Sequence, residues 1–230
     1  MPRPELFVLA GVNGAGKSSI GGLHLEDLGL APADWYNPDT RARELVAEFG
    51  MGQTEANAAA WRAGRELLAH AIATGHSHAF ETTLGGTTIP RLIADASRTH
   101  CVRVWFCGLD SPERHLTRVR ARVQHGGHDI PEAKIRERWV SSVENLIGLM
   151  PLLAELQVYD NSVEADAEGR VPDPQRVLHM SDGAVRYPVS PDEEARTPEW
   201  AMAIVQAALG DPPPGPGRAG SAAARAGHSR

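Results

Sequence analysis

The sequence predicts an α/β domain built on a mostly parallel, five-stranded sheet flanked by helices, with a small C-terminal hairpin. Short apolar segments alternate along the chain with longer segments of helical periodicity, which is the pattern of parallel strands joined by helical crossovers. A glycine-rich loop over residues 11–18 separates the first apolar segment from the first helical one. A loop of that kind at that junction is typical of phosphate-binding loops, so we expect the P-loop NTPase fold.

Regular structure should begin with an apolar strand at residues 6–10, followed by the glycine-rich loop and a helix from about Lys17. A second, short strand should end near Asn37. Pro38 sets that limit, because the residue before a proline is disfavoured in helical conformations.

The middle of the chain alternates between helix and strand. Periodic apolar positions predict helices over residues 40–49 and 53–74, and a third strand follows at residues 77–80. Residues 89–98 are predicted to form a helix. Residues 102–108 combine β-branched and aromatic side chains, which favours a fourth strand.

Two helices are expected between the fourth strand and the fifth. Ser111 is a typical helix N-cap and Pro112 suits the first helical position, so a helix should begin there and end at glycines 126–127. A second helix is expected over residues 131–150. The fifth strand is predicted at residues 157–159.

The C-terminal part should hold a hairpin and a closing helix. Residues 177–180 and 184–187 are predicted strands separated by Ser-Asp-Gly, and residues 198–209 have helical periodicity. Residues 211–230 contain no Leu, Ile, Val, Met or aromatic side chain and concentrate Pro, Gly, Ala and Ser, so we expect a disordered tail. The predicted domain is therefore residues 1–210.

The segment Gly-Val-Asn-Gly-Ala-Gly-Lys-Ser at 11–18 matches the phosphate-loop pattern G-x-x-x-x-G-K-[ST]. Its backbone N–H groups are expected to surround the phosphates of ATP at the positive N-terminus of the following helix. Lys17, one of two lysines in the chain, should reach the β- and γ-phosphates, and the Ser18 hydroxyl should bind Mg²⁺. The predicted ATP-binding residues are Gly11, Asn13, Gly14, Ala15, Gly16, Lys17, Ser18 and Ser19.

Two carboxylates lie where strands should end beside this loop, because the carboxyl ends of parallel strands share one sheet edge. Asp39 follows the second strand and can act as a general base toward a hydroxyl or help hold the metal, although Asn-Pro-Asp is also a common turn and helix cap. Glu81 follows the third strand and can bind a substrate hydroxyl or a metal-bound water, or be an acid favoured at a helix N-terminus. The candidate substrate-binding residues are Glu81, Thr82 and His128.

Three arginines recur every four residues on one face of the helix that Ser111 opens: Arg114, Arg118 and Arg122. This helix runs into a loop with two glycines and a proline, so residues 114–138 have the features of a mobile lid that brings arginines to a migrating phosphoryl group. Arg118 and Arg122 are the catalytic candidates. The alternative is a solvated basic face.

Composition and charge exclude several classes of protein. With 42% hydrophobic and 23% charged residues the chain is neither collagen-like nor wholly disordered, and its formal net charge of −6 argues against nucleic acid as a partner. No apolar run approaches the roughly 20 residues of a membrane helix, so we expect no membrane contact and a cytoplasmic location. The loop histidines lack a third ligand, so no zinc is predicted, and the five tryptophans are expected to be core or packing residues.

Several segments occur in a distinctive order: the phosphate loop, Asn-Pro-Asp at 37–39, Phe-Glu-Thr-Thr-Leu at 80–84, Arg-Val-x-x-Arg-Val ahead of Gly-Gly-His-Asp-Ile-Pro, and Tyr-Asp-Asn-Ser at 159–162. Their order and spacing resemble the zeta-toxin family of small-molecule kinases, over roughly residues 6–162. Zeta toxins use ATP to phosphorylate the sugar of UDP-N-acetylglucosamine, and some are paired with a neutralising antitoxin. The Gly-Gly-His-Asp-Ile-Pro segment resembles a bacterial and phage subgroup of zeta-like ATPases.

This resemblance implies an ATP- and Mg²⁺-dependent kinase domain over residues 1–210 that phosphorylates a hydroxyl of a small acceptor, with a nucleotide sugar as the expected acceptor and an antitoxin protein as a potential partner. It also implies roles for individual residues. Lys17 would bind phosphate, Asp39 would activate the hydroxyl and Glu81 would position the substrate. Arg118 and Arg122 would stabilise the transferring group.

Two alternatives stay open from the residues alone. One is a kinase for another small acceptor, such as an antibiotic. The other is a nucleotide-dependent switch whose phosphate loop controls the binding of a protein partner. Asp39 favours a kinase, because a pure binding module needs no base at that edge of the sheet.

Overall fold

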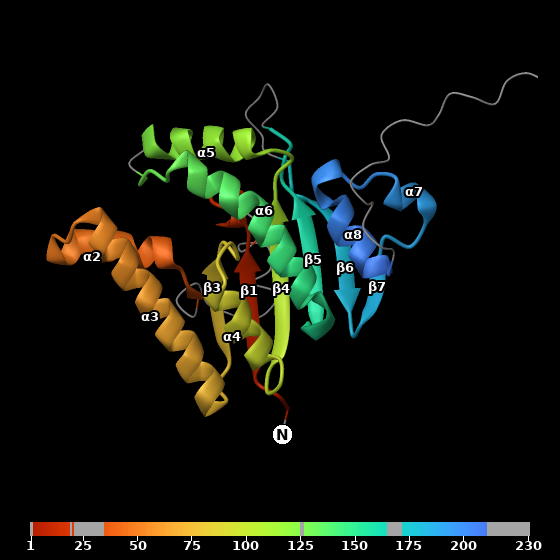
Figure 1. Ribbon diagram of the computed structural model, residues 1–230, viewed down its shortest axis with the longest axis horizontal. Coiled ribbons are helices and arrows are strands. Elements are labelled where there is room, and N and C mark those ends of the chain that lie inside the picture. Colours follow the sequence, from red (N-terminus) through yellow and green to blue (C-terminus); the bar gives the residue numbers. More distant parts are fainter. Residues whose placement is uncertain (1, 19, 21–34, 125–126, 165–171, 211–230) are drawn as a thin grey trace, which may run out of the picture.

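Strands from both halves of the chain form one sheet in the computed structural model, which describes residues 2–18, 20, 35–124, 127–164 and 172–210. Within these residues the strand order is β2-β3-β1-β4-β5-β6-β7 (Figure 1). The first five strands are parallel to one another, as predicted, and β6 and β7 are antiparallel to their neighbours. The strands are β1 (Glu5–Ala10), β2 (Trp35–Tyr36), β3 (His78–Thr82), β4 (Cys101–Gly108), β5 (Glu155–Asp160), β6 (Gln175–Ser181) and β7 (Ala184–Tyr187).

The predicted C-terminal hairpin belongs to the main sheet. β6 pairs with β5 along the whole length of β5, from Glu155 to Asp160. A parallel strand at a sheet edge leaves a row of backbone N–H and C=O groups unpaired, and β6 satisfies this row for β5. The expected five-stranded sheet with a separate hairpin is therefore corrected to a mixed, seven-stranded sheet in the described part of the chain.

Helices connect the strands much as the sequence predicts. Residues 17, 18 and 20 are helical and begin the segment after the glycine-rich loop. The predicted helix over 198–209 divides into a 3₁₀ turn, Glu199–Ala201, and an α-helix. The α-helices are α2 (Pro38–Phe49), α3 (Gln53–Thr74), α4 (Thr88–Ala96), α5 (Pro112–Gln124), α6 (Glu132–Leu149), α7 (Pro191–Glu194) and α8 (Met202–Leu209).

The strands bury both of their faces. Leu6 and Val8 of β1 lie on the face that packs against α3, α4, α6 and α8, and α4 and α6 are seen in front of the sheet in Figure 1. Phe7 and Leu9 lie on the opposite face, where the Phe7 ring stacks on Trp105 with centroids 5.7 Å apart. A strand covered on both faces is apolar throughout, which explains the continuous apolar run of β1. Burial of each such side chain contributes about 1.5–3 kcal/mol and fixes the central strands.

The central strands bring distant segments to one edge of the sheet. β1 lies between β3 and β4, with Ala10 opposite Thr82 on one side and Phe106 on the other. After β1 the chain forms β2 and β3 on one side of β1 and then crosses to β4 on the other side, so the carboxyl end of β1 is the topological switch point. Ligands of open α/β sheets bind at such points.

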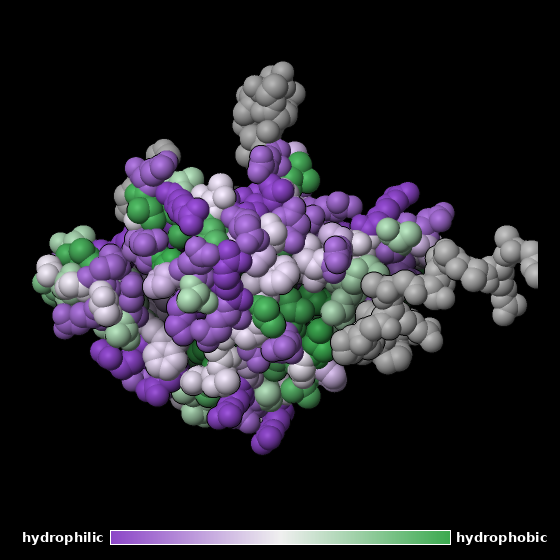
Figure 2. Space-filling view, turned by 45° about the horizontal axis from the view of Figure 1, so that its top comes forward, coloured by the Kyte–Doolittle hydropathy of each residue, from purple (hydrophilic) through white to green (hydrophobic). Residues whose placement is uncertain are grey.

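The face of the molecule shown in Figure 2 is mainly polar. Hydrophilic side chains cover most of the face seen in Figure 2, with hydrophobic side chains in smaller patches between them. Among the described residues, no helix has the length and apolar character that crossing a bilayer would require. The predicted tail at 211–230, Ser19 and residues 125–126 of the predicted lid lie outside the described residues.

Candidate active site

The glycine-rich loop after β1 depends on backbone conformations that favour glycine. Gly11 has a φ of 145° and Gly16 a φ of 85°. A Cβ atom at Gly11 would collide with the Cys107 carbonyl, and one at Gly16 would collide with the Asn161 side chain. The loop therefore lies closely against the ends of β4 and β5. A loop of this form, leading into helical residues 17 and 18, can direct successive N–H groups at phosphate oxygens.

Three side chains from distant elements hold the carbonyl groups of this loop. His115 Nδ1 of α5 lies 2.9 Å from the Asn13 carbonyl oxygen. Asn161 Nδ2 donates to the Ala15 carbonyl oxygen at 2.9 Å, and the Cys107 thiol donates to the same oxygen at 3.0 Å. Burial raises the pKa of Cys107 to about 12, so its sulfur keeps the proton that it donates. The loop is thus fixed from behind, which leaves its other side for a ligand.

His115 should make the stability of the protein depend on pH. Burial lowers the pKa of His115 from 6.5 to about 4, so the folded protein keeps it neutral at pH values where the unfolded chain protonates it. Its contribution is complete above the unfolded pKa and is lost as the pH falls toward the folded one. Between these values we expect the free energy of unfolding to fall by roughly 3 kcal/mol more in the wild type than in His115→Gln. Denaturant unfolding across this pH range measures the difference. An equal dependence of the free energy of unfolding on pH in the wild type and in His115→Gln would contradict it.

Lys17 lies at the boundary between the loop and a cavity. Its Nζ donates to the Gly11 carbonyl oxygen at 2.9 Å, and its side chain lines the cavity with Glu81. Burial raises the pKa of Glu81, the Lys17 charge opposes this, and the Asp39 charge adds to it. The three charged groups therefore act on one another in a single site.

Asp39 is free of the capping role that its sequence context suggested. Asn37 is the N-cap of α2, and its side-chain oxygen accepts from the N–H groups of Asp39 at 2.8 Å and Thr40 at 3.1 Å. The Asp39 carboxylate instead lines the cavity. A carboxylate in a cavity can accept a proton or bind a metal ion.

The Asp39 carboxylate faces two residues of the predicted lid. Arg122 NH1 lies 3.5 Å from Asp39 Oδ2, and His128 Nε2 lies 3.8 Å from Asp39 Oδ1. Arg122 also donates to the His128 carbonyl oxygen at 3.5 Å. Arg122 Nε is buried without a hydrogen-bond partner among the described residues, and Arg122 is not one of the residues that line the cavity.

The remaining arginines of the predicted lid have different surroundings. Arg118 donates to the Asn161 carbonyl oxygen at 2.8 Å, close to Gly16 of the loop. Arg114 instead pairs with Asp110 at 2.8 Å, away from the cavity. The three arginines therefore do not form a uniform solvated face. Arg114 lies at the first turn of α5, Arg118 beside the phosphate loop and Arg122 beside the Asp39 carboxylate.

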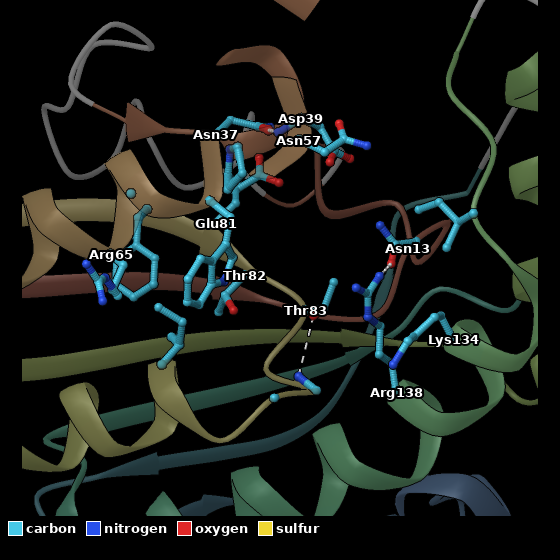
Figure 3. A pocket seen from close by; sticks show the side chains of 18 of the residues that line it. Asn13, Asn37, Asp39, Asn57, Arg65, Glu81, Thr82, Thr83, Lys134 and Arg138 are labelled. Atoms are coloured by element: carbon cyan, nitrogen blue, oxygen red, sulfur yellow. Dashed lines mark hydrogen bonds between the residues drawn. The ribbon is translucent and has the colours of Figure 1, made fainter. Parts of the chain in front are cut away.

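A cavity of about 530 Å³ adjoins the phosphate loop. It is lined by α2, α3, the loop after β3, residues 128–131 and the first turns of α6. In Figure 3, Asn13 and Arg138 point toward each other at one end, and Arg65 lies at the opposite end with Glu81 between them. Arg138 NH1 donates to Asn13 Oδ1 at 2.7 Å, and burial lowers the pKa of Arg138.

The structure brings together most of the site residues that the sequence predicted. Lys17, Asp39, Glu81, Thr82 and His128 line this cavity, along with Asn13. The other described loop residues, Gly11, Gly14, Ala15, Gly16 and Ser18, form the phosphate loop beside it, and Ser19 is outside the described residues.

Sequence reasoning did not predict several contacts of the site. Arg138 is the last residue of the predicted lid and Asn161 lies in the Tyr-Asp-Asn-Ser segment, but nothing local shows that they contact the phosphate loop. The expectation that the tryptophans are core or packing residues is wrong for Trp61, which is 46% exposed and lines the cavity. The guanidinium of Arg65 lies 5.9 Å from its ring centroid, on the next turn of α3.

No protein-family model matches the chain, and no curated protein matches it in sequence. Solved structures do match it. The crystal structure of AvrRxo1-ORF1:AvrRxo1-ORF2 with sulphate ions has a TM-score of 0.57 at 18% identity, over 85% of this chain and 64% of the matched chain. The structure of that complex with ATP has a TM-score of 0.53 at 18% identity, over 78% and 59%. The PezAT chromosomal toxin-antitoxin system of the human pathogen Streptococcus pneumoniae has a TM-score of 0.51 at 18% identity, over 75% of each chain.

The chain has the fold of these structures. Its P-loop architecture is the one that the sequence predicts, with the glycine-rich loop between β1 and a helix at the switch point of a mostly parallel sheet. It spans less than two thirds of the AvrRxo1 chains that it matches, at 64% and 59% of their length. The likeness at 18% identity is one of fold, and the residue roles rest on the site geometry.

Proposed function

We propose that this protein is an ATP- and Mg²⁺-dependent phosphotransferase that phosphorylates a hydroxyl group of a small acceptor. The observation that carries the proposal is the Asp39 carboxylate, which lies in the same cavity as Lys17 while Asn37 caps the helix. A nucleotide-dependent switch requires the phosphate loop but no base beside it. A hydroxyl acceptor requires both.

The residues of the loop fit ATP and Mg²⁺. Gly11 and Gly16 have positive φ values and lie too close to the ends of β4 and β5 for a Cβ atom, so the loop can fold with its N–H groups directed at phosphate oxygens. Lys17 would exchange its bond to the Gly11 carbonyl for the β- and γ-phosphates, and the Ser18 hydroxyl would hold the metal ion. Bound ATP supplies the phosphoryl group, and Mg²⁺ neutralises charge on its oxygens.

Asp39 would act as the general base of the transfer. It accepts the proton of the acceptor hydroxyl while the hydroxyl oxygen bonds to the γ-phosphorus and the bond between that phosphorus and ADP breaks. Arg122 lies beside Asp39, so its guanidinium would stabilise the charge that develops on the transferring group. Glu81, Thr82 and His128 line the same cavity and would bind the acceptor.

The expected acceptor is a nucleotide sugar, with UDP-N-acetylglucosamine indicated by the resemblance to zeta toxins. A cavity of about 530 Å³ has the size of an ordinary small-molecule site. The chain shares its fold with a structure described as a toxin-antitoxin system, which supports an antitoxin protein as a partner. We place the reaction in the cytoplasm, where ATP is available, and assign residues 1–210 as the kinase domain with a lid over about 114–138.

Acceptor-dependent release of ADP tests the proposed function directly. Purified protein is incubated with ATP and Mg²⁺ and with a panel of nucleotide sugars, simple sugars and aminoglycosides. We expect ADP release to rise with one class of acceptor and a phosphorylated acceptor to be detected by mass spectrometry. Tight ATP binding without release for any acceptor would contradict the kinase and favour the switch.

Arg122 should matter more for turnover than for ATP binding. A guanidinium that interacts with the transition state more strongly than with bound ATP contributes to kcat more than to ATP affinity. Arg122→Ala is therefore expected to lower kcat about tenfold, the value of one charge-assisted hydrogen bond, with little change in ATP affinity. Arg120→Ala is the matched control, because Arg120 is an exposed neighbour on α5 that pairs with Glu132 at 3.6 Å. Equal turnover in the two variants would make Arg122 a structural residue.

A further inference from the structure

Residues 172–210 form a C-terminal extension of the domain, which reaches the nucleotide side of the site through Trp200. This residue lies in the 3₁₀ turn before α8, far beyond the last motif of the sequence. Its ring packs against Gly108, where a Cβ atom would overlap the indole, and against Phe106 with centroids 6.3 Å apart. Its Nε1 donates to Asp160 Oδ1 at 3.0 Å. Trp200 therefore contacts the ends of both β4 and β5.

A series of hydrogen bonds continues from Asp160 to the lid. Asp160 is 9% exposed, and its Oδ1 also accepts from the Ser162 hydroxyl. The Ser162 oxygen in turn accepts from the Asp110 N–H at 2.8 Å. The Asp110 carboxylate holds Arg114 at 2.8 Å in the first turn of α5. This series of hydrogen bonds therefore runs from the indole N–H of Trp200, in the C-terminal extension, to Arg114 of the lid.

Asn161 lies between the two residues that this series fixes. Its side chain holds the Ala15 carbonyl of the phosphate loop, and its carbonyl accepts from Arg118 at 2.8 Å. Asn161 is 6% exposed, and its N–H donates to the Gly108 carbonyl at 3.0 Å. Any shift of the backbone at residues 160 and 162 would therefore move both the support of the phosphate loop and the guanidinium of Arg118.

We propose that Trp200 is a positioning residue for ATP, acting through Asp160 and Ser162 on the Asn161 contacts that shape the phosphate loop. The inference rests on the proposed ATP site and gives the C-terminal extension a role in it. The donor matters as well as the ring, because the Asp160 carboxylate is buried and a buried carboxylate depends on its hydrogen bonds for a fixed orientation.

Trp200→Phe tests the proposal, because phenylalanine keeps an aromatic ring against Phe106 and Gly108 and removes the N–H donor. We expect the dissociation constant and KM for ATP to rise about fivefold, the value of one net hydrogen bond, while kcat changes less. Ser162→Ala interrupts the same series from the other end and should raise the ATP constant similarly. In the double variant the two effects should be less than multiplicative, since both act on Asp160.

Ile204→Val is the matched control, because it shortens a fully buried side chain of α8 without touching the series. Its ATP affinity should equal that of the wild type. Direct titration with ATP needs no acceptor, so it distinguishes a failure of the proposed function from a failure of the positioning role. A wild type that binds no ATP would refute the proposed function. Wild-type binding with unchanged affinity in both Trp200→Phe and Ser162→Ala, or an equal loss in Ile204→Val, would overturn the positioning role.

Discussion

Asp39→Asn should reduce phosphoryl transfer by about a hundredfold or more, because asparagine keeps the size and most hydrogen bonding of aspartate but cannot take up the proton of the acceptor hydroxyl. ATP should still bind with nearly wild-type affinity, since Lys17 and the loop amides are untouched. The structure makes this expectation sharper than the sequence could. Asn37 supplies the cap of α2, so a loss of activity in this variant is not a consequence of a lost helix cap.

Turnover, ATP affinity and a Mg²⁺ titration on this variant separate the possible roles of Asp39. A metal-binding role would show as activity partly restored at high Mg²⁺. Asp129→Asn is a suitable control, because Asp129 lines the same cavity and its carboxylate accepts from the Ile130 N–H at 2.8 Å. That variant should keep its turnover. Near-wild-type turnover in Asp39→Asn would rule out the proposed mechanism.

Lys17→Met should lower activity by about a thousandfold or more, since it removes the cation expected to stabilise charge on the β- and γ-phosphates in the transition state. Methionine retains an unbranched stem of similar length, and the folded state loses only the Lys17 bond to the Gly11 carbonyl. The thermal unfolding midpoint should therefore stay close to that of the wild type. Steady-state ADP release measures the activity, thermal unfolding measures the midpoint, and titration with ATP measures the affinity.

Lys134→Met is the control for Lys17, because Lys134 is the other lysine of the chain and its ammonium pairs with Glu137 at 2.8 Å. Its side chain is 56% exposed and its ammonium is held by Glu137, so ATP affinity should not change. Full activity with normal ATP affinity in Lys17→Met would overturn the assignment of the phosphate loop.

The sequence predicts the elements of this fold well where the signals are local. α3 has the predicted bounds, Gln53–Thr74, because Gly52 and Gly75 flank a periodic segment. β7 also has the predicted bounds, Ala184–Tyr187, next to a turn. The phosphate loop is a local motif as well, and the alternation of helix and strand limits where its neighbours can lie.

Features that depend on contacts between distant residues were not visible in the sequence. The contact of Arg138 with Asn13 joins residues 125 positions apart, and nothing near Arg138 distinguishes it from the exposed Arg136 two residues before it. The pairing of β6 with β5 depends on an open strand edge rather than on the hairpin itself. The sequence predicts Trp61 to be a core or packing residue like the other tryptophans, whereas its place on α3 puts it in the wall of a cavity.

The supports of the phosphate loop have a consequence for how the protein folds. The side chains that hold its carbonyls come from positions 92, 102 and 146 residues further along the chain. Each such contact requires the closure of a long loop, so its entropic cost is met only when the central strands have assembled. The motif that appears first during synthesis therefore acquires its binding conformation only after β4, α5 and β5 have been made. A nascent chain that ends before β5 carries the complete glycine-rich sequence but lacks the Asn161 contact that shapes it for a nucleotide.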